Sequence, residues 1–428
     1  MHQRFQTHTT RHHPHGQLLC ELLVAATHAA DPRHQIACTL HSDATHVLIG
    51  NETFTPRGVV LLAVGKAAQT MAAAAAERLG AHLSHGLVIY KDDEGVARHP
   101  RLHYHAAGHP VPDARSLQAG MLARQLVAQT SADQLIVVLL SGGGSALMCD
   151  PYPGITLPMM QQLTRDLLAC GADITAINTI RRRIDRVKGG GLLQAAGTTP
   201  IRTLILSDVI GNPLAAIASG PTVPNPDDAQ AAWQVVRNAG IHVDAAIATI
   251  LDAPLVALPS TSVAPLIIGD IRSALTAVAT AAHAAGYAPI VLSDRLDGEA
   301  RAVGRTLAHI TAYQAQQTAR GCVIAGGETT VTLRGTGRGG RNQELALSAA
   351  MGIAGQPSLL AAAYATDGSD GPTDAAGAVI SGDTLARAHQ PMARLANNDS
   401  YTLFAELDDL LKPGATGTNV NDLFVALW

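Results

Sequence analysis

The chain has 428 residues, of which 47% are hydrophobic and 15% charged, against the roughly 25% charged residues usual in soluble domains. This length is enough for two domains, each with its own hydrophobic core. A formal net charge of −4 and an aromatic content of 3% argue against nucleic acid as a partner, because phosphate binding needs a basic surface and base stacking needs aromatic rings.

The sequence indicates neither a membrane protein nor a disulfide scaffold. Its apolar stretches are interrupted by Asp, Pro or Gly before they reach the ~20 residues of a membrane-spanning helix, so no membrane partner is expected. The cysteines are scattered and form no C-x-x-C pair, which indicates buried thiols in the reducing environment of the cytoplasm. They are Cys20, Cys38, Cys149, Cys170 and Cys322.

The first residues are rich in histidine and lack the apolar core of a signal peptide. The histidines are His2, His8, His12, His13 and His15. Metal binding is one interpretation of this cluster, but we expect residues 1–17 to form a disordered extension outside the fold.

From about Leu18 the chain alternates between short β-rich runs and Ala-rich helical runs. Buried strands are predicted at 59–65, 85–90, 135–140 and 203–208, with a helix between the first two. Strands that alternate with helices indicate βαβ units and a mainly parallel sheet. The first domain is therefore predicted to be α/β.

The proline-rich segment 241–266 interrupts this pattern. Strands resume at 265–269, 288–293 and 321–327, and residues 329–335 alternate as a half-exposed antiparallel strand would. We therefore predict two α/β domains, a larger one over 18–260 with a mainly parallel sheet and a smaller one over 261–428 with a mixed sheet. The boundary between them is expected between residues 260 and 320.

Glycine-rich turns follow several predicted strands, which is where open α/β sheets place ligands. AVGKAA (63–68) puts Lys66 between a strand end and a helix start, where free backbone N–H groups favour an anion. It is not a P-loop, because Ala67 follows the lysine and Val60 stands where the first glycine should be. A phosphate-binding lysine and an ordinary surface lysine both fit this position.

The second turn is LLSGGGSAL (139–147). It lacks the G-x-S-x-G frame of a nucleophile elbow, because Leu147 stands where the last glycine should be. Its glycines let the backbone curl around a ligand and its serines add hydroxyl donors, so we interpret it as an anion-binding nest rather than the site of a catalytic serine. The nest consists of Ser141, Gly142, Gly143, Gly144 and Ser145.

Residues 177–193, INTIRRRIDRVKGGGLL, concentrate positive charge in an otherwise acidic chain. Such a run is usually a solvated helix face, but its position raises the chance that one or two cations reach an anionic substrate. Carboxylates follow other strands and suit a Mg²⁺ ligand or a base as well as ordinary turns. They are Asp208, Glu328, Asp367, Asp370 and Asp374.

RGTGRGGRNQEL (334–345) fits G-x-G-x-x-G at Gly335, Gly337 and Gly340, the fingerprint of a dinucleotide-binding turn. The setting does not fit this fingerprint. A dinucleotide-binding turn follows a buried parallel strand, whereas the preceding strand is predicted to be half-exposed. The fingerprint also has an acidic residue about 20 positions past the turn, and residues 358–362 contain none. Arg338 and Arg341 better suit the terminal phosphates of a nucleotide. Cations, N–H-rich turns and carboxylates together predict phosphoryl transfer.

The chain also resembles the glycerate 2-kinases of bacteria and archaea, some of which carry the name hydroxypyruvate reductase. The resemblance rests on eight motifs in the same order, which are AVGKAA, GHPVPD (108–113), LSGGGSAL, LSDVIG, ASGPT, GGETTVTLRGTGRGGRNQE (326–344), TDGSDGPTDAAGA (366–378) and TGTNVNDL (416–423). It implies a Rossmann-like N-terminal domain, a smaller α/β domain and an active site in the cleft between them. It also implies Mg²⁺ and ATP, with transfer of the γ-phosphoryl group to the 2-hydroxyl of D-glycerate.

By the same resemblance, Lys66 and Arg341 match the positions that act in catalysis. The nest at 141–145 would cradle phosphate or the glycerate carboxylate, and Asp208 or Asp367 would hold Mg²⁺ or accept the hydroxyl proton. Of these two, we take Asp367 as catalytic and Asp208 as the metal ligand. Further substrate- or phosphate-binding residues are expected to be Arg181, Lys188, Glu328 and Arg338.

The chain departs from the family pattern near the basic run. Arg183, Asp185 and Gly191 replace a His, a Ser and an Arg, and Asn212 replaces an Asp. These changes make kinase activity on a related small hydroxy acid one alternative. An NAD(P)H-dependent hydroxypyruvate reductase is another, and a non-catalytic sensor of a phosphorylated metabolite is a third. We expect a cytoplasmic enzyme that is a monomer or homodimer.

Overall fold

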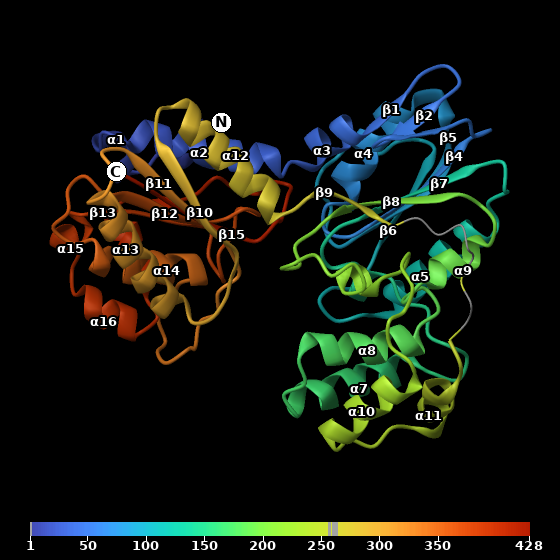
Figure 1. Ribbon diagram of the computed structural model, residues 1–428. Helices are drawn as coiled ribbons and strands as arrows, with labels where there is room; N and C mark the ends of the chain where they lie inside the picture. Colours follow the sequence, from blue (N-terminus) through green and yellow to red (C-terminus); the bar gives the residue numbers. More distant parts are fainter. Residues whose placement is uncertain (1, 256–257, 259–263) are drawn as a thin grey trace. The chain divides into compact units, whose positions relative to one another are not determined.

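The computed structural model describes residues 2–255, 258 and 264–428, and within them the chain divides into two compact units (Figure 1). Unit 1 comprises Met1–His34 and Gly269–Trp428, and unit 2 comprises Gln35–Ile268. The division after Ile268 lies inside the predicted range of 260 to 320. Residues 18–34 differ from the prediction, since they belong with the C-terminal half of the chain.

Unit 2 is built on a six-stranded sheet in the order β6-β5-β4-β7-β8-β9. The strands are β4 (Val59–Val64), β5 (Leu83–Tyr90), β6 (Leu102–Ala106), β7 (Leu135–Leu140), β8 (Ile201–Leu206) and β9 (Leu266–Gly269). The pairs from β6 through β8 are parallel. This is the 3-2-1-4-5-6 order of dinucleotide-binding folds, with its reversal between β4 and β7. The predicted Rossmann-like domain is confirmed.

The central strands are apolar because both of their faces are covered. Every residue of β4 and β7 is buried. Helices α5 (Ala114–Ala128) and α9 (Gly191–Ala196) share one hydrophobic core with β4, β5 and β7, and the Ala-rich helix α4 (Ala68–Leu79) contacts β4, β5 and β7 (Figure 1). Small alanine side chains let α4 lie close to the sheet.

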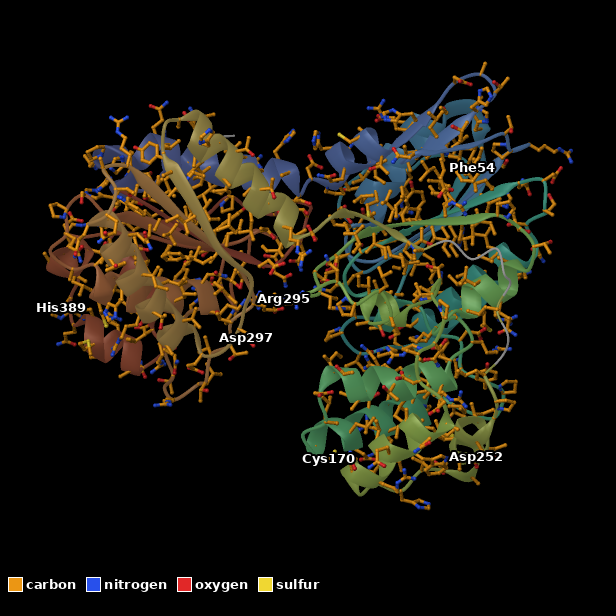
Figure 2. The ribbon with its side chains drawn as sticks, in the orientation of Figure 1. Phe54, Cys170, Asp252, Arg295, Asp297 and His389 are labelled. Carbon is orange, nitrogen blue, oxygen red and sulfur yellow. The ribbon has the colours of Figure 1, made fainter. Side chains whose placement is uncertain are left out.

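A further layer of helices lies below α5 and α9 in Figure 1 and forms its own hydrophobic core. It consists of α7 (Leu157–Ala169), α8 (Ile174–Ile184), α10 (Ala229–Ala239) and α11 (Ala245–Asp252). Figure 2 labels Cys170 and Asp252 in this layer, and Asp252 accepts a hydrogen bond of 2.6 Å from Trp233 Nε1. Side chains of Thr156, Asp173 and Asp228 cap three of the helices.

Shorter elements complete unit 2. They are β1 (Leu40–Ser42), β2 (Val47–Ile49), β3 (Glu52–Phe54), η2 (Gly80–His82), α6 (Gly144–Leu147) and η3 (Ile217–Ser219). The first three strands form a separate antiparallel sheet, and the Phe54 ring, labelled in Figure 2, lies 4.8 Å from the Arg202 guanidinium carbon. Helix α3 (Pro32–Thr39) carries the chain from unit 1 into unit 2.

Unit 1 contains a mixed six-stranded sheet in the order β10-β11-β15-β12-β13-β14. The strands are β10 (Ala288–Leu296), β11 (Gly321–Gly327), β12 (Leu360–Ala365), β13 (Gly377–Ser381), β14 (Leu410–Leu411) and β15 (Asp422–Leu427). Only the β10–β11 pair is parallel. The predicted mixed sheet of the smaller domain is therefore confirmed.

Helices cover this sheet on both faces. Helices α13 (Ala300–Ala315) and α14 (Arg341–Gly352) share a core with the strands, whereas α12 (Ile271–Ala284) packs against α2 (Gly16–Ala29), β10 and β11 (Figure 1). Short helices α15 (Thr384–Arg387), α16 (Pro391–Ala396) and α17 (Ser400–Glu406) complete the unit. No helix within the described residues is long and apolar enough to cross a membrane.

The prediction of a disordered N-terminal extension is wrong for the described residues. Residues His2–Phe5 form η1 and His8–His12 form α1. Thr9 anchors this segment, since its N–H and its hydroxyl donate to Asp409 at 2.7 and 2.8 Å. A buried carboxylate far along the chain supplies these contacts, so composition alone does not reveal them.

Candidate functional site

The point where strand order reverses in unit 2 brings two glycine-containing turns together. Gly65 and Lys66 follow β4, and Ser141 to Gly144 follow the neighbouring strand β7. The Lys66 N–H donates to Gly142 O at 2.8 Å, and the Ala67 N–H donates to Ser141 Oγ at 3.0 Å. Open α/β sheets bind ligands at such a crevice, outside the carboxyl ends of the strands.

The two turns leave little room for larger side chains. Gly143 has φ of +85°, a conformation that favours glycine, and a Cβ there would lie 2.9 Å from Cδ2 of His109. A Cβ on Gly142 would collide with the Asp208 carboxylate, which follows β8. The structure therefore places Lys66, His109 and Asp208 around one glycine turn, where Lys66 is exposed and the other two side chains are half-buried.

The serines of the predicted nest have structural partners. Ser141 is buried, and its hydroxyl joins the two turns through Ala67. Ser145 Oγ lies 2.7 Å from Ser219 Oγ, and Ser219 in turn donates to Asn178 of α8 at 3.2 Å. Of the five predicted nest residues, Gly142, Gly143 and the half-buried Ser145 have the exposure that a ligand-binding residue needs.

The basic run is not a solvated helix face. Arg182 is buried and donates to Asp227, and Arg183 is buried and donates to carbonyl oxygens at the end of α11, including Leu251 O at 2.8 Å. Arg186 donates to Asp150 at 2.5 Å. These arginines join α8 to its neighbours, so three of the run's cations stabilise the helical layer.

Lys188, which the sequence predicts to bind substrate, forms a buried ion pair. It is 3% exposed, and its ammonium donates to Asp185 Oδ2 at 2.5 Å and to Met148 O at 2.8 Å. Burial opposes its charge, but the Asp185 carboxylate outweighs burial and raises the pKa of Lys188. Asp185 is one of the departures from the family pattern, and the structure shows that it is the partner of this buried lysine.

Arg181 faces a cavity of about 340 Å³ between α7, α8 and the loop around Pro110. The walls are mainly apolar, with Met160, Leu163 and Ile177 among them, and Ser145 lies at the same cavity. Burial lowers the pKa of Arg181. Arg181 and Lys188, the two predicted cations of this run, both line this cavity together with the predicted nest residue Ser145.

In unit 1, the predicted catalytic arginine is held between two carboxylates. Arg341 Nε donates to Asp422 Oδ2 at 2.5 Å and its Nη2 donates to Asp422 Oδ1 at 3.1 Å, while its Nη1 lies 2.9 Å from Glu328 Oε1. Burial opposes the charge of Arg341, but these acidic partners prevail and raise its pKa. The guanidinium is therefore permanently charged, oriented and still 34% exposed.

Sheet register explains why these residues meet. Asp422 begins β15 and pairs with Gly327 at the end of β11 and with Ala365 at the end of β12. Glu328 directly follows β11, and Asp367 follows β12, so both belong to the same edge of the sheet as Asp422. Asp367 is half-buried and accepts a hydrogen bond of 2.9 Å from the Ser369 N–H.

Asp370 fixes the start of α14, the helix that begins with Arg341. Its carboxylate accepts the N–H groups of Asn342 and Gln343 at 3.1 and 2.9 Å. Burial raises the pKa of Asp370 to about 7, with a further contribution from Asp422, although the two N–H groups and Arg341 favour the charged form. Burial also raises the pKa of Asp422, and Arg341 only partly compensates.

The G-x-G-x-x-G loop is part of the packing of unit 1. The N–H groups of Arg334 and Gly335 donate to Asn398 Oδ1 at 2.7 and 3.0 Å, and the Arg338 N–H donates to Asp399 Oδ1 at 3.1 Å. Cβ atoms on Gly335 or Gly337 would collide with residues 397 and 399. These N–H groups bind the protein itself, so they are not a pyrophosphate cradle.

The predicted strand at 329–335 is wrong, since only Thr330 makes an isolated bridge there. The loop instead runs from the buried strand β11 to α14. Arg338, predicted to bind phosphate, is exposed with its guanidinium 4.1 Å from the centre of the Tyr401 ring. The Asp374 carboxylate accepts hydrogen bonds from the Tyr401 hydroxyl at 2.6 Å and from the Lys412 ammonium at 3.1 Å. Neither partner forms a hydrogen bond with Arg341 among the residues that the structure describes.

Two residues of the site were missed by the sequence reasoning. His109 lies in the GHPVPD motif, and Asp422 lies in TGTNVNDL. Both motifs are distinctive in the sequence, but a single His or Asp in a motif does not show which turn its side chain reaches. Among the described residues, no three His, Cys, Asp or Glu side chains form a group that could hold a metal ion.

Family comparisons cover most of the chain. Residues 18–252 match a family described as a domain of unknown function, DUF4147, and residues 321–422 match the MOFRL family. A protein of Thermotoga maritima named D-glycerate 2-kinase is 38% identical over 379 residues, which cover 86% of this chain and 90% of that protein. A mouse protein named glycerate kinase is 34% identical, with 95% and 92% covered.

A third relative carries a different name. It is a protein of Agrobacterium vitis named putative hydroxypyruvate reductase, 37% identical, with 95% of this chain and 93% of that protein covered. The crystal structure of a glycerate kinase from Thermotoga maritima matches with a TM-score of 0.87 and 34% identity, covering 96% of this chain and 98% of the other. The PH0495 protein of Pyrococcus horikoshii matches with a TM-score of 0.85 and 31% identity, covering 96% and 98%.

Proposed function

The chain belongs to the glycerate kinase family, and from this we propose that it transfers the γ-phosphoryl group of ATP to the 2-hydroxyl of D-glycerate, giving 2-phosphoglycerate. The observation that carries the proposal is a cation at a sheet edge in each unit, the exposed Lys66 in unit 2 and Arg341, held by two carboxylates, in unit 1. Phosphoryl transfer depends mainly on positioning and on cations that offset moving negative charge.

In unit 2, Lys66 would bind the transferring phosphoryl group. It follows the first strand at the reversal of strand order, and its backbone is fixed by the hydrogen bond to Gly142. Its ammonium is exposed, which leaves it able to pair with a phosphate oxygen. Gly142 and Gly143 would let the phosphate chain approach the backbone closely.

In unit 1, Arg341 would offset the charge that develops on the β,γ-bridging oxygen as the bond to the γ-phosphorus breaks. Asp422 and Glu328 leave the guanidinium fixed in one orientation, which favours stabilisation of the transition state over ground-state binding. In this role Glu328 positions the arginine, which replaces the predicted direct contact with phosphate. Each unit contributes one of the two cations.

Mg²⁺ fits the carboxylate that follows β8. Mg²⁺ bound to a nucleotide usually has one or two protein carboxylates, with water and phosphate oxygens as its other ligands. Asp208 beside Gly142 suits that requirement, and we propose it as the protein ligand. When bound, the ion would neutralise charge on the phosphate oxygens. Asp367 is the second predicted carboxylate, and its role is tested together with that of His109 below.

The oxidoreductase alternative finds less support. The glycine loop that matches the dinucleotide fingerprint uses its N–H groups on Asn398 and Asp399, and the N-terminal N–H groups of α14 are bound to Asp370. The first turn of the Rossmann-like sheet reads AVGKAA, and with Gly65 as the first glycine of the fingerprint the other two are replaced by Ala67 and Thr70. A lysine there suits a terminal phosphate.

The test is an ATP-dependent assay with D-glycerate in which pyruvate kinase and lactate dehydrogenase report ADP. In a second assay enolase is added directly to the product. We expect turnover in both, because the 2-phosphate is a substrate of enolase. A product that reaches enolase only after a mutase is added would show phosphorylation at the 3-hydroxyl. NADH oxidation by hydroxypyruvate without ATP would favour the reductase.

We also propose that the enzyme acts in the cytoplasm as a monomer or homodimer. Size-exclusion chromatography with light scattering measures the oligomeric state. The acceptor range is tested in the same ADP assay with other small 2-hydroxy acids.

A further inference from the structure

The GHPVPD motif has no role in the function described so far. Residues 107–113 follow β6 and lead into α5, and they bring one side chain, His109, to the glycine turn after β7. A Cβ placed on Gly143 would lie 3.0 Å from Nε2 of His109 and 3.5 Å from Cγ of Lys66. His109 and Lys66 therefore border the same small space above this turn.

The segment that carries His109 is firmly held. The Gly108 N–H donates to Ser116 Oγ at 3.2 Å, and the Ser116 hydroxyl lies 3.3 Å from Gly108 O. Asp113 caps α5 by accepting the N–H groups of Arg115 and Ser116 at 2.9 and 3.2 Å. The imidazole is thus presented by a loop fixed at both ends, as a positioned acid or base requires.

The surroundings of His109 favour the neutral imidazole. Burial lowers the pKa of His109, and the charges of Lys66 and Lys91 lower it further, while Asp92 opposes them. Lys91 and Asp92 form an ion pair at 3.0 Å, so the lysine effect comes mainly from Lys66. Asp208 lies on the other side of the glycine turn, next to Gly142. A neutral imidazole at pH 7 can accept a proton.

We propose that His109 is the general base that accepts the proton of the acceptor hydroxyl. The inference rests on the proposed kinase function and names a residue for a step that the sequence attributed to a carboxylate. The hydroxyl oxygen forms a bond to the γ-phosphorus, and the bond from that phosphorus to the β,γ-bridging oxygen breaks, its electron pair leaving with ADP. The hydroxyl proton passes to the unprotonated ring nitrogen of His109, and the imidazolium then returns it to water.

His109 suits this step better than the two carboxylates. Asp208 is the residue best suited to Mg²⁺, and a carboxylate that binds a cation is a weaker base. His109 shares one turn with Lys66, the cation proposed to bind the transferring group. A base whose pKa lies near the operating pH also transfers protons more efficiently than a carboxylate of ordinary pKa.

The experiment compares His109→Gln with wild type from pH 5 to 9 in the ADP assay. We expect kcat to fall about 10² to 10³-fold with little change in the KM for ATP. Wild-type kcat should fall at low pH with an apparent pKa below the ordinary histidine value, and this acid limb should be absent from the variant. His103→Gln, an exposed histidine on β6, is the matched control and should keep both kcat and its pH profile.

Two further measurements make the outcome decisive. His109→Ala should regain activity when imidazole is added, and nuclear magnetic resonance titration of wild-type His109 should give the pKa of the kinetic acid limb. The second measurement needs no variant to fold. Unchanged kcat and acid limb in His109→Gln, or loss of the acid limb in Asp208→Asn or Asp367→Asn alone, would overturn the proposal. Absence of ATP-dependent turnover in wild type would instead overturn the proposed function, and the role of His109 with it.

Discussion

Lys66 owes its proposed role to its position, because nothing else at its turn carries a full positive charge close to the glycines. Lys66→Ala should lower kcat by about 10³-fold, the scale of losing one well-placed electrostatic group in the transition state. The measurement is the ADP assay at saturating ATP and D-glycerate. The unfolding midpoint should hardly change, since this side chain is exposed.

Lys91 provides the matched control for this variant. It is a lysine at the same sheet edge, following β5, and it pairs with Asp92. Lys91→Ala should keep kcat within about threefold of wild type, because screened surface charges contribute little. Equal losses in the two variants would mean that general positive potential, and not Lys66 itself, supports the reaction.

Arg341 requires its geometry as well as its charge. Arg341→Lys keeps the charge but cannot form the two parallel hydrogen bonds to Asp422, so we expect a loss of kcat of about 10² to 10³-fold. Asp422→Asn keeps the shape of the partner and removes its charge, and should cost about tenfold, since Glu328 still pairs with the arginine. If Asp422→Asn raised only KM, the carboxylate would bind substrate and would not orient Arg341.

Asp370 predicts a pH dependence of stability. Its pKa is about 7 in the folded protein, above the ordinary value of 3.8, so the folded state binds this proton more tightly than the unfolded state does. Its contribution to stability is therefore fully present below pH 4 and is lost as the pH rises to about 7. Asp370→Asn cannot ionise and should escape this loss.

Urea unfolding of wild type and Asp370→Asn between pH 4 and 8 measures this effect. The free energy of unfolding of the variant relative to wild type should rise between pH 4 and 7, by about 1 to 4 kcal/mol, and then level off. Asp422 titrates nearby and is the same in both proteins. A difference that stays constant with pH would show that Asp370 is ionised throughout.

At the scale of elements, Lys188 pairs with Asp185 at the end of α8 and also donates to Met148 O in the segment after β7. Lys188→Met leaves Asp185 buried without its cation, which should cost about 3 to 5 kcal/mol of unfolding free energy. The double variant with Asp185→Leu should recover much of that loss, because no buried charge remains. Chemical denaturation of the three proteins tests this, and equal stability of single and double variants would contradict it.

The strands of both sheets were largely predictable because the chain marks them with continuous apolar runs. The predicted runs at 59–65, 135–140 and 321–327 are β4, β7 and β11. The antiparallel strand at 329–335 was wrong, because its alternation comes from a loop whose backbone is held by Asn398 and Asp399. The local pattern of residues cannot show that backbone N–H groups of this segment bind Asn398 and Asp399, more than 60 residues further along the chain, instead of a neighbouring strand.

The sequence shows which predicted site residues lie together where a turn follows a strand, but it does not show which charged side chains pair with each other. Lys66, Gly142 and Asp208 lie together because parallel strands end at one edge. Lys188 and Glu328 are predicted to touch substrate, but each pairs with an oppositely charged side chain of the protein, Lys188 with Asp185 and Glu328 with Arg341. A run of basic residues in the sequence therefore does not show which of their side chains are exposed.

At the scale of the whole molecule, the chain enters and leaves unit 2 once each, so unit 2 is a continuous insertion in unit 1. A fragment of residues 35–268 contains its whole sheet except Gly269, the last residue of β9, and should unfold cooperatively by itself. A fragment of residues 269–428 lacks α2, which packs on α12 and contacts β12, and should be much less stable. Adding a peptide of residues 2–34 should raise its melting temperature. Thermal unfolding followed by circular dichroism measures the stability of both fragments. If the peptide left the melting temperature of the 269–428 fragment unchanged, residues 2–34 would not belong to unit 1.

The split of unit 1 also sets an order of events on the ribosome. Helix α2 is made early, yet its partner α12 begins only at Ile271, after all of unit 2 has been synthesised. At the usual elongation rate of about 5 to 20 residues per second, the apolar side chains of α2 wait for more than ten seconds without a surface to cover them. Unit 2 can complete its fold during that interval. The nascent chain therefore carries one finished globule before the other can close, and nascent α2 is the segment that a chaperone would meet first.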